Sequence, residues 1–445
     1  MKKSAMRFPN NNKIFVVILT LINVTFVAAC LYSNNGKWEV DQKWLGSSAE
    51  NKELTDNSSM TLDFTYEDAV GDYRFFSSLL DESYPFCSVV ERRYGVKISD
   101  IESKFFTGLN EHQKDMSIEI FTELLDETVR SFQSVGGICL VDSRLYKDYL
   151  ESYQDIHKKS KNYITLHDKK VKMTYDYLSK LESELSAEQR HNDYLQKILF
   201  KTLENRIAYL KVPVMYTGEE IEKNWKEIKK FYEEIGDCHS LIIDITENRG
   251  GDDLFWWYNL VIPNIGETIK YGSYFSMKQS RINIDFVNEH IIDIQQYMRE
   301  LREIDSLTKV NKEDIKEFNI FYRINNSISP SKLRKREFYG DIYVLVDDEV
   351  YASADNFAKF CKDTGFATVV GKNTGGGGGG VEPMLVSLPN SGLIIRYSIL
   401  YVMNEDGSCV EEFGTVPEYI SRADETPMEA CLRVIKDKEK GQKRK

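Results

Sequence analysis

The fold is decided by the stretch Asp341-Ile-Tyr-Val-Leu-Val-Asp347, which continues as Asp348-Glu-Val-Tyr-Ala352-Ser-Ala-Asp355 and ends in Ala367-Thr-Val-Val-Gly371. An apolar run, an acidic turn, a helix-like segment and a β-branched run predict a strand, a turn, a helix and a second strand. The turn lies at the N-terminus of the helix, where free N–H groups and the helix dipole stabilise developing negative charge. The pattern therefore predicts a β-turn-α-β unit whose reactive corner is the turn.

The composition is that of a globular protein with more than one domain. The chain has 445 residues, enough for two or three domains, and 42% of them are hydrophobic. Its formal net charge of −12 argues against a nucleic-acid role, because phosphate binding needs a basic face. The seven cysteines form no CxxC pair and no zinc-ligand spacing. We therefore expect free thiols, no metal, no cofactor, and a polypeptide or small-molecule partner.

The N-terminus has the pattern of an export signal. Four basic residues precede the apolar run 14–29, namely Lys2, Lys3, Arg7 and Lys13. This order predicts an extracytoplasmic protein. The run ends in Val27-Ala-Ala-Cys30, which resembles a bacterial lipobox and predicts lipid attachment at Cys30. An uncleaved membrane anchor is the alternative, because the run extended to Tyr32 approaches the ~20 residues that span a bilayer.

Residues 61–205 predict a helical domain. Apolar residues recur there at helical spacing, for example Phe75, Leu79, Leu80, Ile118, Phe121, Leu125 and Val129. Within this region, the apolar residues of 163–173 around Asp168-Lys-Lys170 favour a hairpin. Residues 175–204 favour one long helix, because leucines recur along them at helical spacing.

A second buried strand ends in a pair of glycines, in the stretch Ser240-Leu-Ile-Ile-Asp244-Ile-Thr-Glu-Asn248-Arg-Gly250-Gly251. Glycine lets the backbone adopt positive φ and approach a substrate carbonyl closely. A plain turn after a parallel strand is the alternative. The preceding stretch Ile207-Ala-Tyr-Leu-Lys-Val-Pro213 alternates as a further strand.

These stretches, in this order, resemble the C-terminal-processing (tail-specific) and tricorn-core serine peptidases. Val344-Leu-Val-Asp347 and Val369-Val-Gly371 match the two core strands of that family without a gap. The same alignment places the nucleophilic serine of the family at Ala352. The neighbouring Ser353 is the competing candidate, but using it breaks the spacing to both strands. Ala352 is therefore interpreted as a departure from the family.

The resemblance implies roles for further residues. The histidine base of the tricorn-like branch corresponds to Lys211, for which an ordinary strand lysine is the alternative. The amides at Gly250, Gly251 and Ser353 correspond to the oxyanion hole. Glu411 corresponds to the glutamate that supports the base.

The six glycines Gly375–Gly380 do not form a nucleotide-binding loop, because Val381-Glu382 stand where Lys-Ser/Thr would follow. The catalytic lysine of the tail-specific branch corresponds to Gly377, so the Ser/Lys dyad is absent. The tract resembles the glycine-rich loop of the tricorn-like branch. That resemblance implies that the backbone at Gly375, Gly376 and Gly377 approaches the substrate. No PDZ domain is recognisable.

The resemblance implies an α/β fold, with a crossed β-sheet core of the ClpP/crotonase-like type flanked by helices and a helical N-terminal domain. The expected parts are a signal peptide or anchor at 1–30, a linker at 31–60, the helical domain at 61–205, the core at 206–425 with an insertion at 252–340, and a C-terminal helix with a basic tail at 426–445.

The expected function is that of a serine endopeptidase lineage, outside the cytoplasm and anchored to the bacterial cell membrane through the N-terminus. With Ala352 as the nucleophile position, this chain is expected to be inactive or nearly so. The alternative is a pseudopeptidase that binds peptides or regulates a partner. The oxyanion role further predicts that Ala352 and the Gly250–Gly251 turn face each other across one cleft.

Overall fold

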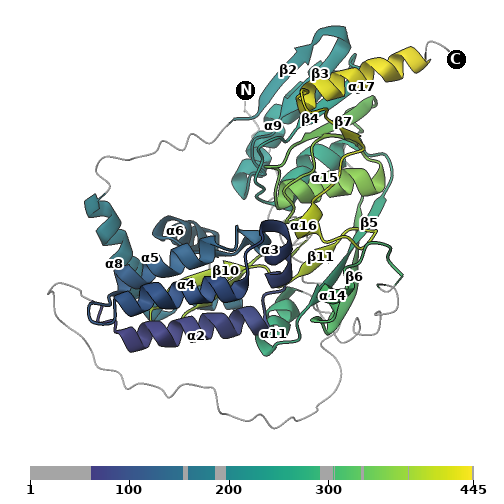
Figure 1. Cartoon of the computed structure of the whole chain (residues 1–445). Coiled ribbons are helices and arrows are strands. Elements are labelled where there is room, and N and C mark those ends of the chain that lie inside the picture. The colour runs from purple at the N-terminus through teal and green to yellow at the C-terminus, as the bar shows by residue number, and fades with distance from the viewer. Residues whose placement is uncertain are drawn as a thin grey trace, which may run out of the picture.

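The structure is a computed structural model of the chain. It describes residues 62–153, 159–185, 197–290, 304, 306–331, 335–378 and 380–442. The segment 1–61, which contains the predicted signal, Cys30 and the linker, lies outside the described residues. Figure 1 shows a mainly helical part and a part built on a sheet.

A six-stranded sheet forms the centre of the core, in the order β12-β8-β7-β4-β3-β2. Its strands are β2 (Leu199–Leu203), β3 (Ile207–Lys211), β4 (Ser240–Asp244), β7 (Asp341–Val346), β8 (Thr368–Gly371) and β12 (Tyr419–Ile420). Strands β12, β8, β7, β4 and β3 are parallel, and β2 is antiparallel to β3. Parallel strands bring their carboxyl ends to one edge, so the turns after β4 and β7 lie side by side.

The two faces of this sheet belong to different cores. Leu241 and Ile243 of β4 pack in a cluster with residues of α15 (Ser353–Thr364) and α9 (Glu219–Glu234). Ile242 points the other way, into a cluster with α17 (Pro427–Gln442). All five residues of β4 are buried, which explains why its sequence is almost continuously apolar.

The N-terminal part consists mostly of helices. They are α2 (Tyr66–Glu82), α3 (Cys87–Tyr94), α4 (Ile98–Glu111), α5 (Ile118–Arg130), the 3₁₀ turn η1 (Val135–Gly137), α6 (Ser143–Ser152), α7 (Lys161–Leu166) and α8 (Lys169–Leu185). Side-chain caps mark several starts. Thr65 and Asp68 form a capping box on α2, and Ser117 caps α5.

Two smaller antiparallel sheets complete the fold. β5 (Ile269–Met277), β6 (Ile320–Ile328) and β11 (Tyr401–Met403) form one, in the order β11-β5-β6. β1 (Cys139–Leu140), β9 (Met384–Ser387) and β10 (Ile394–Tyr397) form the other, in the order β1-β10-β9. Because β1 pairs with β10, a strand from the C-terminal half runs among the N-terminal helices (Figure 1).

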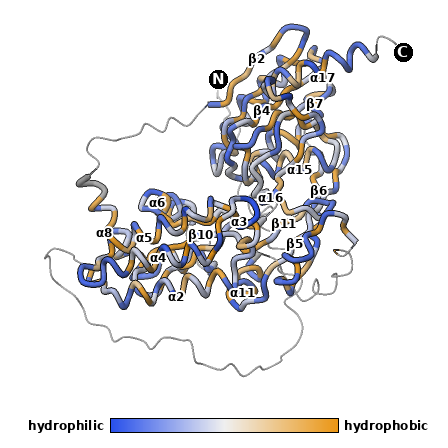
Figure 2. Tube along the Cα trace, in the orientation of Figure 1, coloured by the Kyte–Doolittle hydropathy of each residue, from blue (hydrophilic) through white to orange (hydrophobic). Residues whose placement is uncertain are grey.

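Short elements connect these parts. They are η3 (Glu204–Arg206), α10 (Asp253–Trp256), the π-turn η4 (Trp257–Val261), η5 (Ile262–Asn264), α11 (Arg281–His290), α14 (Lys312–Ile315) and α16 (Val410–Phe413). Figure 2 shows apolar stretches inside both the helical part and the sheet. The region 252–340, predicted as an insertion, contributes both β5 and β6.

The prediction of an α/β core with a helical N-terminal domain is confirmed. Two local predictions are wrong. Residues 163–173 are not a hairpin but the helix α7 and the start of α8, because Ser160 caps α7 and Asp168 accepts the N–H of Lys170. Of the long helix predicted over 175–204, the structure describes helix as far as Leu185, whereas residues 199–203 form β2, so the central sheet begins before the predicted boundary at 206.

Candidate active site

Ala352 occupies a strained turn between β7 and α15. It is the N-cap of α15, with φ of 52° and ψ of −123°. A residue with a Cβ rarely adopts this conformation, and holding it costs about 1–3 kcal/mol. Strain of this kind concentrates at functional sites, where it aims one side chain at a chosen point. Ala352 is also partly exposed, so a ligand can reach it.

The Gly250 turn lies directly against Ala352. A Cβ placed on Gly250 would lie 2.9 Å from the Cβ of Ala352 and 3.0 Å from the backbone N of Ser353. The N–H of Tyr351 donates to the carbonyl of Asn248 at 3.1 Å and locks the two turns together. The structure thus brings Ala352 and Gly250 face to face.

Two backbone N–H groups of the turns that meet at Ala352 have no acceptor in the described part of the chain. The N–H of Gly250 is occupied, because it donates to Oδ1 of Asn248 at 2.9 Å. Within the described part of the chain, the N–H groups of Gly251 and Ser353 have no acceptor. Ser353 is the first residue of α15, where such N–H groups carry the positive end of the helix dipole.

Gly251 is a glycine for steric reasons. Its φ is +134°, and a Cβ there would lie 1.7 Å from the carbonyl oxygen of Met215. The N–H of Met215 donates to the carbonyl of Gly250 at 2.9 Å, and the N–H of Asp252 donates to Met215 at 3.0 Å. No side chain fits between these two segments, so the glycine pair is required by the turn itself.

The side chain of Ser353 points away from this arrangement. Ser353 is only 8% exposed, and its hydroxyl is buried beside the carboxyl group of Asp253. Burial raises the pKa of Asp253, whose carboxyl group also accepts from Nε1 of Trp256 at 2.9 Å. A buried hydroxyl cannot meet a substrate carbonyl, so this geometry opposes Ser353 as the nucleophile.

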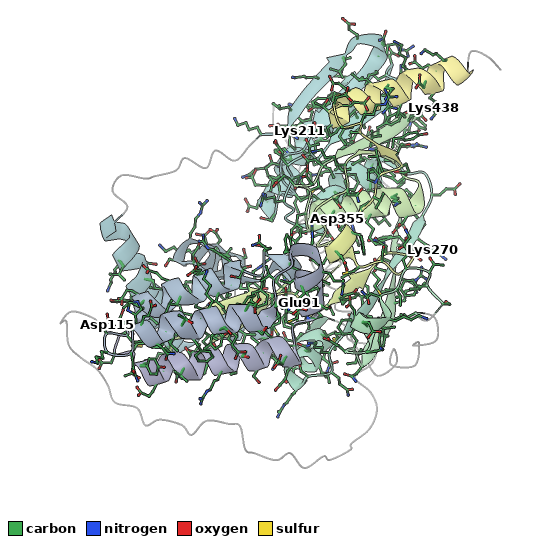
Figure 3. The ribbon with its side chains drawn as sticks, in the orientation of Figure 1. Glu91, Asp115, Lys211, Lys270, Asp355 and Lys438 are labelled. Atoms are coloured by element: carbon green, nitrogen blue, oxygen red, sulfur yellow. The ribbon has the colours of Figure 1, made fainter. Side chains whose placement is uncertain are left out.

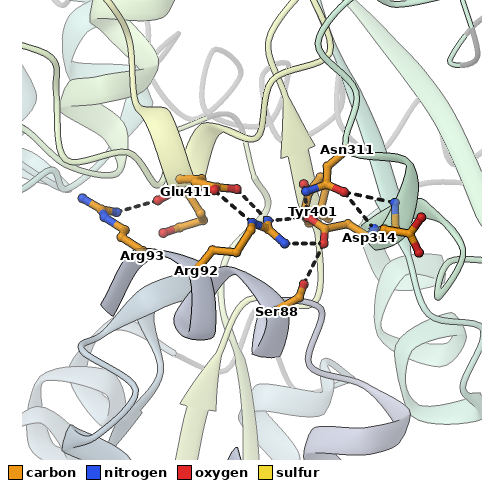
Figure 4. A network of polar contacts seen from close by, with 9 residues as sticks. Ser88, Arg92, Arg93, Asn311, Asp314, Tyr401 and Glu411 are labelled. Atoms are coloured by element: carbon orange, nitrogen blue, oxygen red, sulfur yellow. Dashed lines mark hydrogen bonds and ion pairs between the residues drawn. The ribbon is translucent and has the colours of Figure 1, made fainter. Parts of the chain in front are cut away.

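Glu411 joins the site through Tyr351. The hydroxyl of Tyr351 donates to Oε1 of Glu411 at 3.0 Å, while Oε2 is buried without a partner. Glu411 is 5% exposed, and this burial raises its pKa to about 7. Arg93 of α3 donates to the backbone carbonyl of Glu411 at 2.6 Å (Figure 4). A carboxyl group with a pKa near neutrality, next to the nucleophile position, is suited to proton transfer.

The glycine tract wraps around the start of α15. The N–H of Ala352 donates to the carbonyl of Gly376 at 3.0 Å. A Cβ on Gly376 would lie 2.5 Å from the carbonyl oxygen of Val410, and one on Gly377 would lie 2.5 Å from the ring of Tyr351. The glycines therefore meet the protein's own backbone and side chains. Only Gly375 and Gly377 are partly exposed among the three predicted to approach substrate.

Asp355 of α15 holds this glycine tract against the start of the helix. It is fully buried and accepts a hydrogen bond from the hydroxyl of Thr374 and one from the N–H of Gly378, at 3.1 Å. The N–H of Thr415 donates in turn to the Thr374 hydroxyl at 2.6 Å. Burial raises the pKa of Asp355. Its place is structural, since it ties α15 to the loops on both sides.

Lys211 lies in a different group of residues. Its Nζ donates to Oδ1 of Asp244 at 3.1 Å, and to the hydroxyl and backbone carbonyl of Thr246 at 2.5 and 2.7 Å. Figure 3 places it toward the β3 end of the sheet, away from Asp355. None of its hydrogen bonds or ion pairs to described residues reaches Ala352 or Glu411. The structure therefore does not bring the predicted base position to the predicted nucleophile position.

Four residues of the site were missed from the sequence. Tyr351 carries the bond to Glu411, and Asn248 holds the glycine turn. The backbone of Gly136 and Gly137, from the N-terminal part, lies beside Glu411 and Tyr351 and lowers their pKa values against the larger effect of burial. Gly136-Gly137 signals a turn in the sequence, but nothing local indicates which residues that turn meets.

No metal or membrane-spanning element is found in the part of the chain that the structure describes. In those ranges no three His, Cys, Asp or Glu side chains gather in a way that holds a metal ion. Over the same residues, none of the helices has the length and apolar character needed to cross a bilayer.

Comparisons with known proteins agree with this geometry. Residues 206–421 match the model of peptidase family S41. No curated protein matches the sequence. Among solved structures, a candidate peptidase from Parabacteroides merdae is 18% identical with a TM-score of 0.50, and the match covers 82% of this chain and 96% of that one. Mature CPAF in complex with lactacystin is 13% identical with a TM-score of 0.50, over 84% of this chain and 97% of that one.

At these identities the two structures show a shared fold, which extends beyond the core into the N-terminal helices because more than four-fifths of this chain is covered. The family match contains β3, both turns that meet at Ala352, and α16 with Glu411. Residues 206–421 of this chain therefore belong to peptidase family S41.

Proposed function

We propose that this chain binds polypeptides in a peptidase-type cleft and does not cleave them. The observation that carries the proposal is the turn at Ala352, a strained conformation facing Gly250 with a methyl group at its tip. The strain and the free N–H groups are retained there without a group that attacks a carbonyl. A strained turn that lowers stability and yet persists without a nucleophile supports a role in binding.

The chemistry of the lineage explains what is missing. In a serine peptidase of this type, a serine oxygen attacks the scissile carbonyl, and backbone N–H groups stabilise the resulting oxyanion. The N–H groups of Gly251 and Ser353 have no acceptor among the described residues, which supports this role for them. The methyl group of Ala352 supplies neither a nucleophile nor an acyl acceptor. Binding without turnover follows.

A labelled unfolded protein tests this proposal. We expect fluorescein-labelled β-casein to bind the parent protein and to remain intact after long incubation. Ala352→Trp places a large side chain in front of Gly250, so binding should weaken at least about tenfold, as for loss of a central contact. The matched control is Leu432→Trp, on the exposed side of α17. Fragmentation by the parent, or equal binding to Ala352→Trp, contradicts the proposal.

We further propose that the chain is tethered outside the cytoplasmic membrane by its N-terminus. The support is the basic head, the apolar run and Val27-Ala-Ala-Cys30. Mass spectrometry of the mature protein from membranes should find a lipid-modified Cys30 as its first residue. A chain that still begins at Met1 indicates the uncleaved anchor instead, and a soluble, unmodified product contradicts the tether.

A further inference from the structure

Arg396 on β10 is a partly buried arginine whose described partners are all neutral. Its Nη1 donates to the carbonyl of Gly137 at 2.6 Å. The hydroxyl of Tyr149 and the thiol of Cys139 lie beside the guanidinium, and burial raises the pKa of both groups, so they stay neutral at pH 7. The Nε atom is buried without an acceptor. No ion pair between described residues includes Arg396.

This state is unusual for a charge in such a place. Burying an unpaired charge is strongly destabilising, so a buried arginine is normally paired with a carboxylate. Arg92 in the same protein follows that rule, because it is paired with Asp314 and Glu412. Arg396 retains an uncompensated positive charge in a chain whose formal net charge is −12. Because no carboxylate of the described chain pairs with Arg396, this charge favours the binding of an anion from a ligand.

The guanidinium lies close to the nucleophile position. A Cβ on Gly137 would lie 2.8 Å from Nη1 of Arg396, and the N–H of the same glycine approaches the hydroxyl of Tyr351. Tyr351 is the residue before Ala352. Gly137 thus contacts both Arg396 and Tyr351, and Ala352, Tyr351 and Arg396 are each partly exposed. A chain bound at Ala352 therefore has Arg396 within reach.

Two carboxylates of this part of the protein accept hydrogen bonds from tyrosines. Glu411 accepts from the hydroxyl of Tyr351, and Glu382 accepts from the hydroxyl of Tyr153. Neither forms an ion pair with Arg396. Among the described residues, no ion pair neutralises the positive charge of Arg396.

We propose that Arg396 receives a carboxylate of the polypeptide bound in the cleft, either an Asp or Glu side chain or the C-terminal carboxylate. The planar guanidinium matches a carboxylate in shape and charge. This inference rests on the proposed function and adds to it the class of ligand, a polypeptide with an acidic group at a fixed distance from Ala352.

A random octapeptide library tests the inference. The library is made in two forms, with a free C-terminal carboxylate and with a C-terminal amide, and peptides retained by the immobilised protein are sequenced by mass spectrometry. We expect the parent to enrich peptides with a carboxylate at one position, less strongly at high salt. Arg396→Gln should lower that enrichment about tenfold or more, the usual effect of losing a hydrogen bond to a charged group.

The control removes an equal charge elsewhere. Arg433 lies on α17 and pairs with Glu425, so Arg433→Gln breaks that pair and should leave the enrichment unchanged. Arg396→Lys keeps the charge and should retain part of the preference. Enrichment of Asp or Glu in both library forms identifies a side chain, and enrichment of the free-acid form alone identifies the C-terminus.

Each failure has its own meaning. If the parent retains peptides with no preference for a carboxylate, the inference about Arg396 is wrong and the proposed function stands. The same holds if Arg433→Gln loses the preference as strongly as Arg396→Gln does. If the parent retains no more peptide than heat-denatured protein, the proposed function fails first. These outcomes do not require the Arg396→Gln variant to fold, because the parent alone decides two of them.

Discussion

Ala352→Ser is expected to make the protein react covalently with a fluorophosphonate probe, while the parent stays unlabelled. The Cβ of residue 352 already faces Gly250 at the tip of a strained turn, so the substitution adds one oxygen where a nucleophile is needed. Loss of a nucleophile costs up to about 10⁶-fold in rate in serine peptidases. We therefore expect at least a ~100-fold gain in labelling rate, even for an imperfectly restored site.

The matched controls are Ser353→Ala and the double variant Ala352→Ser/Ser353→Ala. The double variant should label as fast as Ala352→Ser, because the hydroxyl of Ser353 is buried beside Asp253. Strong labelling of the parent that disappears in Ser353→Ala overturns the assignment of position 352. A folded Ala352→Ser that never labels shows that more than one oxygen atom is missing.

The pH dependence of this labelling tests Glu411. Burial raises its pKa to about 7, so the carboxyl group is protonated below that pH and ionised above it. Only the ionised form accepts a proton or stabilises a protonated base, so the labelling rate of Ala352→Ser should rise with pH up to about 7 and then level off. Adding Glu411→Gln should flatten the profile. An unchanged profile excludes Glu411 from the chemistry.

The sequence was most informative where structure is local. The strand, turn and helix around Ala352 follow from short-range patterns, and the order of the motifs predicted that this turn meets Gly250. The hairpin prediction failed although the signals for helices were present. Ser160 and Asp168 are capping residues, and their side chains bind the N–H groups of Tyr163 and Lys170. The alternating apolar residues favoured strands over helices here, because a helix of two turns is too short to show the helical spacing of its apolar residues.

Contacts between distant segments could not be predicted. The turn at Gly136 and Gly137 reaches Tyr351 and Glu411 only because β1 pairs with β10, and no local pattern specifies that pairing. Lys211 was placed by alignment alone, and its side chain turns to Asp244 instead. The contacts of the glycine tract with Val410 and the ring of Tyr351, where a Cβ at Gly376 or Gly377 would clash, were likewise not foreseen from the sequence.

Asp314→Ala is expected to lower the free energy of unfolding by about 3–5 kcal/mol, the cost of breaking a buried ion pair by removing one partner. The side chain of Asp314 is fully buried. It accepts from both terminal nitrogens of Arg92 at 2.7 Å, from the hydroxyl of Ser88 at 2.8 Å and from that of Tyr401 at 2.7 Å (Figure 4). The variant leaves the hydroxyls of Ser88 and Tyr401 without this acceptor, and it leaves Arg92 with Glu412 as its one remaining ion-pair partner among the described residues. Urea denaturation followed by circular dichroism measures the loss.

The control is Glu127→Ala, which removes a carboxylate from an exposed ion pair with Lys104. It should lower the free energy of unfolding by less than about 1 kcal/mol. Asp314 differs because it joins α14 to α3 and β11, and Arg92 extends the same network to Glu412, the neighbour of Glu411. Loss of Asp314 should therefore also loosen α16 and weaken the binding of β-casein. Equal stability losses in the two variants would show that burial and the shared donors of Asp314 add nothing.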